Sequence, residues 1–120
     1  IMSPYNVSKA AIIMLSACLA KELGAYNVNV NVVNPGFVFT DIYAAGGENS
    51  NAQKLKSKLP QVFAHATTSE EIVNTMAMAS NMRRMQTAED MANAVLFLAS
   101  EFSCNVSGQY INVDAGTLYR

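Results

Sequence analysis

Two side chains that could exchange protons lie at helical spacing near the start of the chain. Tyr5 and Lys9 are four residues apart within the segment Ser3–Lys9, so they become neighbours on one face once this segment is helical. Free phenols and ammonium groups titrate only near about pH 10. A cation within roughly 4–6 Å of a phenol, however, favours the phenolate form. Tyr5 is therefore a candidate general acid or base, with Lys9 as the cation beside it.

The same segment carries the signals of a helix start. Ser3 is a favoured N-cap residue, and Pro4 suits the first helical position because its missing N–H would have no partner there. From Tyr5 to Leu23 the side chains are apolar nearly all round, so we expect this helix to be buried on more than one side. We expect Gly24 to follow it as the C′ residue.

A strand and a sharp turn come next. Val28–Asn34 alternates between β-branched and polar residues, which predicts a strand. Pro35-Gly36 should end this strand, because proline cannot extend a ladder and glycine permits unusual backbone angles. In open α/β sheets, ligands bind just beyond the carboxyl ends of strands. The segment Asn34–Thr40 is therefore a candidate binding segment from its position.

The end of the chain repeats the order of helix and strand. Thr87 is a favoured N-cap residue, with Glu89 and Asp90 in the first turn to complement the helix dipole. Apolar residues then recur at helical spacing as far as Ala99, so this helix should pack on a sheet. Gln109–Asp114 alternates like the first strand and predicts a second one.

The middle of the chain, Asp41–Gln86, predicts short helices separated by turns. The stretch Ala44–Asn51 is rich in turn residues. One helix is expected after it over Ala52–Leu59, and another from Ser69. Because such segments bury little surface, we expect this region to be mobile and to close over a substrate as a lid. Four methionines either line that lid or fill gaps in a core: Met76, Met78, Met82 and Met85.

Composition excludes several classes of function. The chain has 120 residues, of which 51% are hydrophobic and 14% charged, which indicates apolar contacts beyond the chain itself. Its net charge of −1 gives no electrostatic footprint for nucleic acid or an anionic membrane. No apolar run reaches membrane-spanning length and no signal peptide is evident.

Few residues could bind a metal, and no metal site is expected. Cys18 and Cys104 lack metal-ligand spacing, so we interpret them as buried or incidental thiols of a reducing, cytoplasmic compartment. His65 is the only histidine and is expected in a loop or at the rim of a pocket. The three lysines of the middle region are expected to form a solvated face: Lys54, Lys56 and Lys58.

Three ordered motifs together resemble one family. Tyr5, Ser8 and Lys9 form Tyr-x-x-Ser-Lys, similar to the signature of the short-chain dehydrogenases/reductases. The Pro35-Gly36 turn, with Val and Thr after it, resembles the cofactor-binding turn of that family. The pattern from Ala94 through Ser107-Gly108-Gln109 to Asn112–Gly116 resembles the family's C-terminal end, with Ala115 in place of a glycine.

The resemblance implies the fold and the extent of the domain. It implies an α/β fold, a three-layer Rossmann-type doubly wound parallel sheet, of which residues 1–120 form the C-terminal half. The chain would thus be part of a single NAD(P)-binding domain, with a substrate lid at about residues 41–86. The family's glycine-rich pyrophosphate loop and its catalytic serine do not occur in this sequence, so we expect a fragment.

The resemblance also implies an oxidoreductase activity. Tyr5 would pass a proton to or from the oxygen of a small secondary alcohol or ketone, while hydride moves between the substrate and NAD or NADP. Lys9 would favour the tyrosinate and hold the nicotinamide ribose hydroxyls. Val38 would contribute backbone groups and Thr40 a hydroxyl to the carboxamide and phosphates. The residues placed at the cofactor are Tyr5, Lys9, Pro35, Gly36, Val38 and Thr40.

Other readings stay open at this point. A cofactor-binding or scaffold protein of the same fold, without turnover, would differ in the residues that precede Ile1. An isolated helical interaction module conflicts with two strands whose edges would be left open. A helix apolar all round predicts a homodimer through the Ala10–Leu23 face. A second contact through Thr87–Ser100 and the last strand would give the homotetramer that the resemblance implies.

Overall fold

The computed structural model describes residues 3–40 and 51–118, with the backbone alone for residues 51 and 52. Its contacts divide the chain into two compact units: unit 1 comprises residues 1–34 and 92–111, and unit 2 comprises residues 35–91 and 112–120. The elements are α1 (Ser3–Leu23), the 3-10 turn η1 (Gly24–Tyr26), β1 (Val32–Pro35), α3 (Asn51–Lys58), α4 (Ser69–Met78), α5 (Ala88–Leu98), the 3-10 turn η2 (Glu101–Ser103) and β2 (Tyr110–Val113). The turn-rich stretch expected before α3 lies largely outside the described residues.

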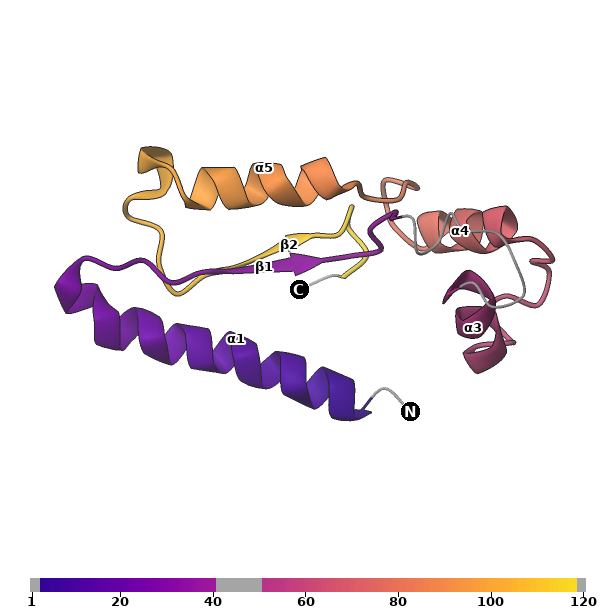
Figure 1. Ribbon diagram of the computed structural model, residues 1–120, viewed down its shortest axis with the longest axis horizontal. Coiled ribbons are helices and arrows are strands. Elements are labelled where there is room, and N and C mark those ends of the chain that lie inside the picture. The colour runs from indigo at the N-terminus through magenta and orange to yellow at the C-terminus, as the bar shows by residue number, and fades with distance from the viewer. Residues whose placement is uncertain (1–2, 41–50, 119–120) are drawn as a thin grey trace. The chain divides into compact units, whose positions relative to one another are not determined.

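β1 and β2 lie side by side as a parallel pair (Figure 1). In unit 1 the Gly108 N–H donates to the Val30 carbonyl at 2.8 Å, and in unit 2 the Gly36 N–H donates to the Val113 carbonyl at 3.0 Å. Residue numbers rise together along both segments, which is the parallel pattern. The parallel pairing predicted for this fold is therefore present in these two strands.

The first strand is shorter than the expected Val28–Asn34. It begins at Val32. The residues before it make one backbone bond to the segment that leads into β2, from the Gly108 N–H to the Val30 carbonyl, and otherwise bond to that segment through side chains. The Asn31 side chain donates from Nδ2 to the Val106 carbonyl at 2.7 Å, and its Oδ1 accepts the Gln109 N–H at 3.0 Å. Asn31, a polar residue of the alternating segment, thus links this segment to the residues that lead into β2.

Both ends of α1 differ from the expectation by a few residues. Ser3 already belongs to the helix and is therefore not its N-cap, while Pro4 still lies in the first turn, where its missing N–H costs no helical bond. At the other end, η1 follows, and the left-handed residue is Asn27, with φ 60°. Gly24 is not left-handed, and Asn tolerates this conformation because its short polar side chain bonds locally.

α1 is less covered than its composition predicted. The described helix has no buried residue. One stripe, formed by Ile13, Ser16, Ala20 and Leu23, is half-buried. The opposite face is exposed at Val7, Met14 and Leu15. The chain by itself thus half-buries one side of this helix, and the burial of its other side by a partner subunit stays a prediction.

Unit 1 has a layered order. Figure 1 shows α1 on one side of the paired strands and the unit 1 part of α5 on the other. The half-buried stripe of α1 faces the start of β2, where a Cβ on Gly108 would lie 3.4 Å from the Ala20 Cβ. The three-layer arrangement predicted from the sequence is thus present around this pair of strands.

α5 starts as predicted. The Thr87 N–H donates to Asp90 Oδ2 at 2.8 Å, and the Asp90 N–H donates to Thr87 Oγ1 at 3.2 Å. Each residue thus satisfies a backbone donor at the helix start, as in a capping box. The hydrogen bond from the Thr87 backbone lowers the pKa of the Asp90 carboxyl.

The buried apolar residues that the structure describes lie in the middle of the chain. The cluster consists of Phe63, Ala66, Ile72 and Met76, with Leu55 and Met85 packed against it. The expectation that Asp41–Gln86 buries little surface is therefore wrong for its described part, because α3 and α4 pack together. Met76 and Met85 therefore belong to the core, whereas Met78 and Met82 are exposed and their place in a substrate lid stays a prediction.

A capping box begins α4. Thr68 Oγ1 accepts the Glu71 N–H at 3.2 Å, and Glu71 Oε2 accepts the Thr68 N–H at 3.0 Å and the Thr67 N–H at 2.5 Å. These bonds, first that from the Thr67 backbone, lower the pKa of the Glu71 carboxyl.

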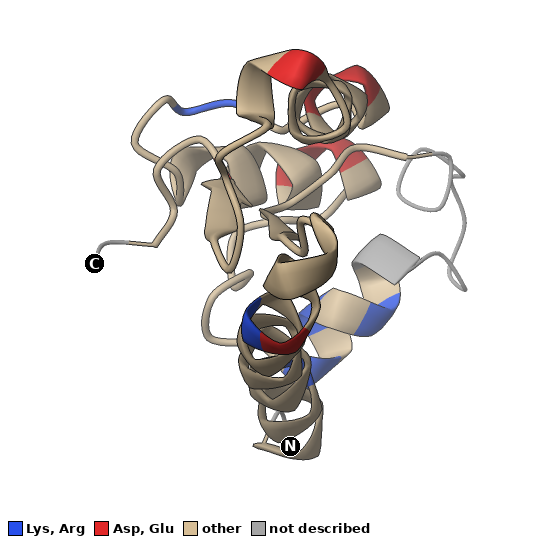
Figure 2. Ribbon diagram, turned by 90° about the vertical axis from the view of Figure 1, so that its left-hand side faces the viewer, with Lys and Arg blue, Asp and Glu red and all other residues tan. Residues whose placement is uncertain are grey.

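The charged residues of unit 2 lie mainly on its short helices (Figure 2). Lys54 and Lys58 on α3 are exposed, as expected of a solvated face. Lys56 is not, because it is half-buried and its Nζ donates to the Ala66 carbonyl. One lysine of the three therefore ties α3 to the segment before α4.

Truncating the centre of the unit 2 core should destabilise this unit strongly. Ile72 has no exposed surface, so Ile72→Ala should lower the free energy of unfolding by about 2–5 kcal/mol. Ile12→Ala is a matched control, because Ile12 is 48% exposed and exposed substitutions usually change stability by about 0.5 kcal/mol or less. Denaturant unfolding of both variants measures the difference, and equal losses would contradict the described core.

The capping box should make stability depend on pH. Because folding lowers the pKa of Glu71, its contribution is present above the unfolded pKa and is lost as the pH falls through the folded pKa. Glu71→Gln should therefore lose less stability than the wild type between about pH 7 and about pH 3. Glu70→Gln, beside it, removes none of these bonds and should follow the wild type in thermal unfolding; a wild-type slope for Glu71→Gln would contradict the assignment.

Candidate functional site

Tyr5 and Lys9 are brought together on the first turns of α1. The Lys9 Nζ lies over the Tyr5 ring, 5.5 Å from its centroid, a distance at which an ammonium group and an aromatic face attract each other. Both side chains are exposed. The predicted proximity of the phenol and the ammonium group is therefore present within one helix.

The pair lies on the face of α1 that turns toward the strands. Counting from Tyr5 in steps of four and three residues leads through Lys9 to the half-buried Ile13 and Ser16, which is the spacing of a single helical stripe. The pair thus extends the half-buried stripe toward the helix N-terminus. Its side chains project to the same side as the residues that face β2.

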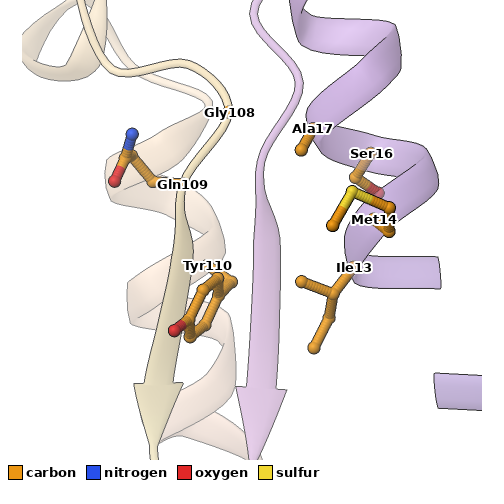
Figure 3. Close-up of a pocket in the computed structure, with 7 residues that line it drawn as sticks. All are labelled: Ile13, Met14, Ser16, Ala17, Gly108, Gln109 and Tyr110. Carbon is orange, nitrogen blue, oxygen red and sulfur yellow. The ribbon is translucent and has the colours of Figure 1, made fainter. Parts of the chain in front are cut away.

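A cavity of about 150 Å³ lies farther along the same stripe (Figure 3). It is lined by Ile13, Met14, Ser16 and Ala17 of α1 and by Gly108, Gln109 and Tyr110. Its lining is mainly apolar and holds neither Tyr5 nor Lys9. The cavity therefore reflects the packing of α1 against β2 rather than the place where proton transfer would occur.

The two serines near Tyr5 have structural positions. Ser8 Oγ donates to the Tyr5 carbonyl at 2.7 Å, a bond to the preceding turn that serine commonly makes in helices. Ser3 is part of the same helix. Neither serine is therefore placed as a separate group facing the phenol.

The Pro35-Gly36 turn is closely packed in unit 2. A Cβ on Gly36 would lie 2.4 Å from Gln86 Oε1 and 2.7 Å from the Asp114 Cα. Gly36 does not have a left-handed φ, so the expectation of unusual backbone angles is wrong here. Glycine is required at this position because two neighbouring segments approach it too closely for a side chain.

The segment after the turn is held by one partner residue. Val38 and Gln86 form a parallel bridge, in which the Gln86 N–H donates to the Phe37 carbonyl at 3.0 Å and the Phe39 N–H donates to the Gln86 carbonyl at 2.6 Å. In this pattern the N–H and C=O of Val38 itself point away from Gln86. Neither group bonds to another described residue.

Thr40 ends the described part of this segment. Its side chain is exposed, whereas Val38 is half-buried and Pro35 is exposed. The predicted cofactor residues thus lie in two groups: Tyr5 and Lys9 in unit 1, and Pro35 to Thr40 in unit 2. Each group is compact within its own unit.

Two buried polar residues beside Gly36 were missed from the sequence. Asp114 is 7% exposed, and its carboxylate accepts the Gly116 N–H at 2.9 Å and the Leu118 N–H at 3.0 Å. Gln86 is 3% exposed. An acidic residue at the end of a strand was a usable signal for Asp114, but nothing in the local sequence marks Gln86.

Other candidate groups show no catalytic arrangement. Cys18 and Cys104 are free and exposed, so of the two interpretations, buried or incidental thiols, only the second agrees with the structure. His65 lies in an exposed turn, as expected. Within residues 3–40 and 51–118, no three histidine, cysteine or acidic side chains gather as metal ligands would. No helix in the described part of the chain has the length and hydrophobicity needed to cross a membrane.

Known proteins resemble this chain over nearly its whole length. A family model described as enoyl-(acyl carrier protein) reductase matches residues 2–80 and 61–117. A 3-oxoacyl-(acyl-carrier-protein) reductase of Chlamydia pneumoniae is 35% identical over 96% of this chain and 38% of its own length. Carbonyl reductase (NADPH) 2 of Sus scrofa is 33% identical over 98% of this chain and 40% of its own length. The chain thus spans less than half the length of these relatives.

Solved structures agree with this relationship. L-sorbose reductase of Gluconobacter frateurii, complexed with NADPH and L-sorbose, matches with a TM-score of 0.77 and 30% identity over 97% of this chain and 40% of that protein. A short chain dehydrogenase family protein of Francisella tularensis matches with a TM-score of 0.74 and 26% identity over 94% of this chain and 42% of that protein. The chain belongs to the short-chain dehydrogenase/reductase family and has part of its Rossmann-type α/β fold.

Proposed function

We propose that this chain is the proton-transferring and nicotinamide-binding part of an NAD(P)-dependent oxidoreductase that interconverts a secondary alcohol and a ketone. The observation that carries the proposal is the Tyr5–Lys9 pair on one helix face, with Nζ 5.5 Å from the ring centroid, in a chain of the short-chain dehydrogenase/reductase family. The activity belongs to the complete protein that contains these residues.

The proton step follows from the positions of Tyr5 and Lys9. In the reductive direction, the Tyr5 hydroxyl gives its proton to the substrate oxygen and becomes a tyrosinate, which the Lys9 ammonium group stabilises. The exposed position of Tyr5 allows solvent to return the proton. In the oxidative direction, the tyrosinate accepts the proton of the alcohol.

NAD or NADP, when bound, supplies or accepts the hydride at its nicotinamide ring. The segment after Pro35-Gly36 fits this ring through its main chain. A carboxamide offers both a donor and an acceptor, and Val38 offers an N–H and a C=O that bond to no other described residue. The exposed Thr40 hydroxyl would reach a phosphate oxygen, and Lys9 would bond the ribose hydroxyls.

The relatives support a carbonyl substrate. The names of the matched proteins specify reduction of a 3-oxoacyl group on acyl carrier protein, of a carbonyl compound and of L-sorbose. All three names imply a carbonyl group that becomes an alcohol. We therefore propose a ketone as the substrate. The cytoplasmic location that we propose rests separately on the cysteine content of the sequence.

A second proposal concerns assembly. The face of α1 opposite the half-buried stripe exposes Val7, Met14 and Leu15 at 68%, 65% and 58%. An apolar face of this kind is a preferred protein contact. We propose a homodimer through α1, and a homotetramer if α5 and β2 form a second contact.

Removing the Tyr5 hydroxyl should abolish most turnover. Tyr5→Phe in the complete protein should lower kcat by about 10²–10⁴-fold, because the acid/base group is lost, while the melting temperature stays unchanged for an exposed side chain. Tyr26→Phe is the matched control, since Tyr26 is 77% exposed in η1. Cofactor absorbance during ketone reduction measures turnover. Wild-type turnover in Tyr5→Phe would refute the assigned role, and cofactor binding without turnover in the wild type would favour a non-catalytic protein of the same fold.

A charge on the exposed face of α1 should weaken assembly. Leu15→Lys places a cation among apolar side chains, so the complete protein should shift toward smaller species in light scattering at micromolar concentration. Lys21→Glu, near the end of the same helix but exposed and already charged, is the control. A monomeric wild type would contradict the proposed interface.

A further inference from the structure

Gln86 is a buried polar residue that joins its own segment of unit 2 to the segment Gly36–Phe39. It is 97% buried, although it is a polar residue directly before the capping box of α5. Its backbone holds Phe37 and Phe39 through two hydrogen bonds. The residue between them is Val38, whose N–H and C=O form the proposed nicotinamide-binding edge.

The side chain of Gln86 fixes this backbone from two sides. Its Nε2 donates to the Arg84 carbonyl at 3.1 Å. Its Oε1 lies against Gly36 so closely that a Cβ there would come within 2.4 Å. The side chain thus spans from Arg84 to Gly36, two residues before Val38.

Burial of the Gln86 side chain lowers the stability of the fold through one of its atoms. Gln86 Oε1 is buried and has no hydrogen-bond partner among the described residues. A buried acceptor without a partner costs about 1–3 kcal/mol, a cost that an apolar side chain of similar length would avoid. Such a group calls for an explanation other than packing.

We propose that Gln86 is a positioning residue, whose side chain sets the distance between the Pro35-Gly36 turn and the Val38 edge so that this edge meets the nicotinamide carboxamide. The inference rests on the proposed function, because it concerns the same cofactor. Gln86 itself need not touch the cofactor. The side chain fixes the position of the Gln86 backbone, and the two hydrogen bonds of that backbone hold Phe37 and Phe39 on either side of Val38.

Gln86→Met tests the role, because methionine has similar length but neither donates to Arg84 nor leaves an unpaired oxygen. The complete protein should bind NADH or NADPH, whichever the wild type prefers, about tenfold more weakly, which corresponds to about 1.4 kcal/mol. ADP-ribose, or its 2′-phosphate for an NADP-binding protein, lacks the nicotinamide and should bind as it does to the wild type. Titration calorimetry measures both dissociation constants, and thermal unfolding should show no loss of stability.

The chain offers a matched control in Gln109. Its Nε2 also donates to a carbonyl two residues earlier, that of Ser107 at 3.2 Å, but its side chain is exposed and lies in unit 1. Gln109→Met makes the same chemical change in the unit that does not contain Val38. Both dissociation constants should stay at their wild-type values in this variant.

The outcomes separate the two levels of the proposal. Weaker binding of the intact dinucleotide alone supports the positioning role. If both ligands bind to Gln86→Met as they do to the wild type, the side chain has no role in binding and the proposal is overturned. If both ligands bind equally more weakly and the melting temperature falls, the role of Gln86 is a general structural one, which also overturns the proposal. A wild type that binds neither ligand overturns the proposed function, and the positioning role with it.

Discussion

The parallel pairing of two segments almost eighty residues apart is the constraint on which the other features depend. The bond from the Gly108 N–H to the Val30 carbonyl and the bond from the Gly36 N–H to the Val113 carbonyl set the register in the two units. If the pairing of the strands shifted by one residue, every side chain of the shifted strand would turn to the opposite face of the sheet. In unit 1 this register places the start of β2 against α1. In unit 2 it brings the Asp114 backbone so close to the turn that only glycine fits at position 36.

The sequence predicted the elements well wherever the determining interaction was local. Thr87 and Asp90 are three residues apart and bond to each other, so this helix start could be predicted from four consecutive residues of the sequence. The same holds for α4, whose start at Ser69 follows a capping box, and for the spacing of Tyr5 and Lys9. Such interactions need no knowledge of the fold, because residues three or four apart on a helix are neighbours in any context.

Features set by distant segments could not be predicted in this way. The amide of Asn31 bonds to residues more than seventy positions away, so the role of this polar side chain could not be read from the alternating pattern. Gly36 looked like a turn residue, whereas the close approach of Asp114 and Gln86 is its actual requirement. Ala115, considered a mild departure from glycine, has a φ of 52°, a left-handed conformation that costs most non-glycine residues roughly 1–2 kcal/mol. That cost became visible only with the backbone angles.

The two parts of the proposed site use different chemistry, and the fold explains why. Proton transfer requires side chains with particular acidities, and α1 would provide them as Tyr5 and Lys9, which lie four positions apart on one helix. Recognition of a carboxamide requires only a donor and an acceptor at fixed separation, which any residue except proline supplies from its main chain. The identity of residue 38 is therefore weakly constrained, while the residues that hold it, Gly36 and Gln86, are constrained by space and burial. Specificity at such an edge depends on the neighbours that hold it rather than on the residue that forms it.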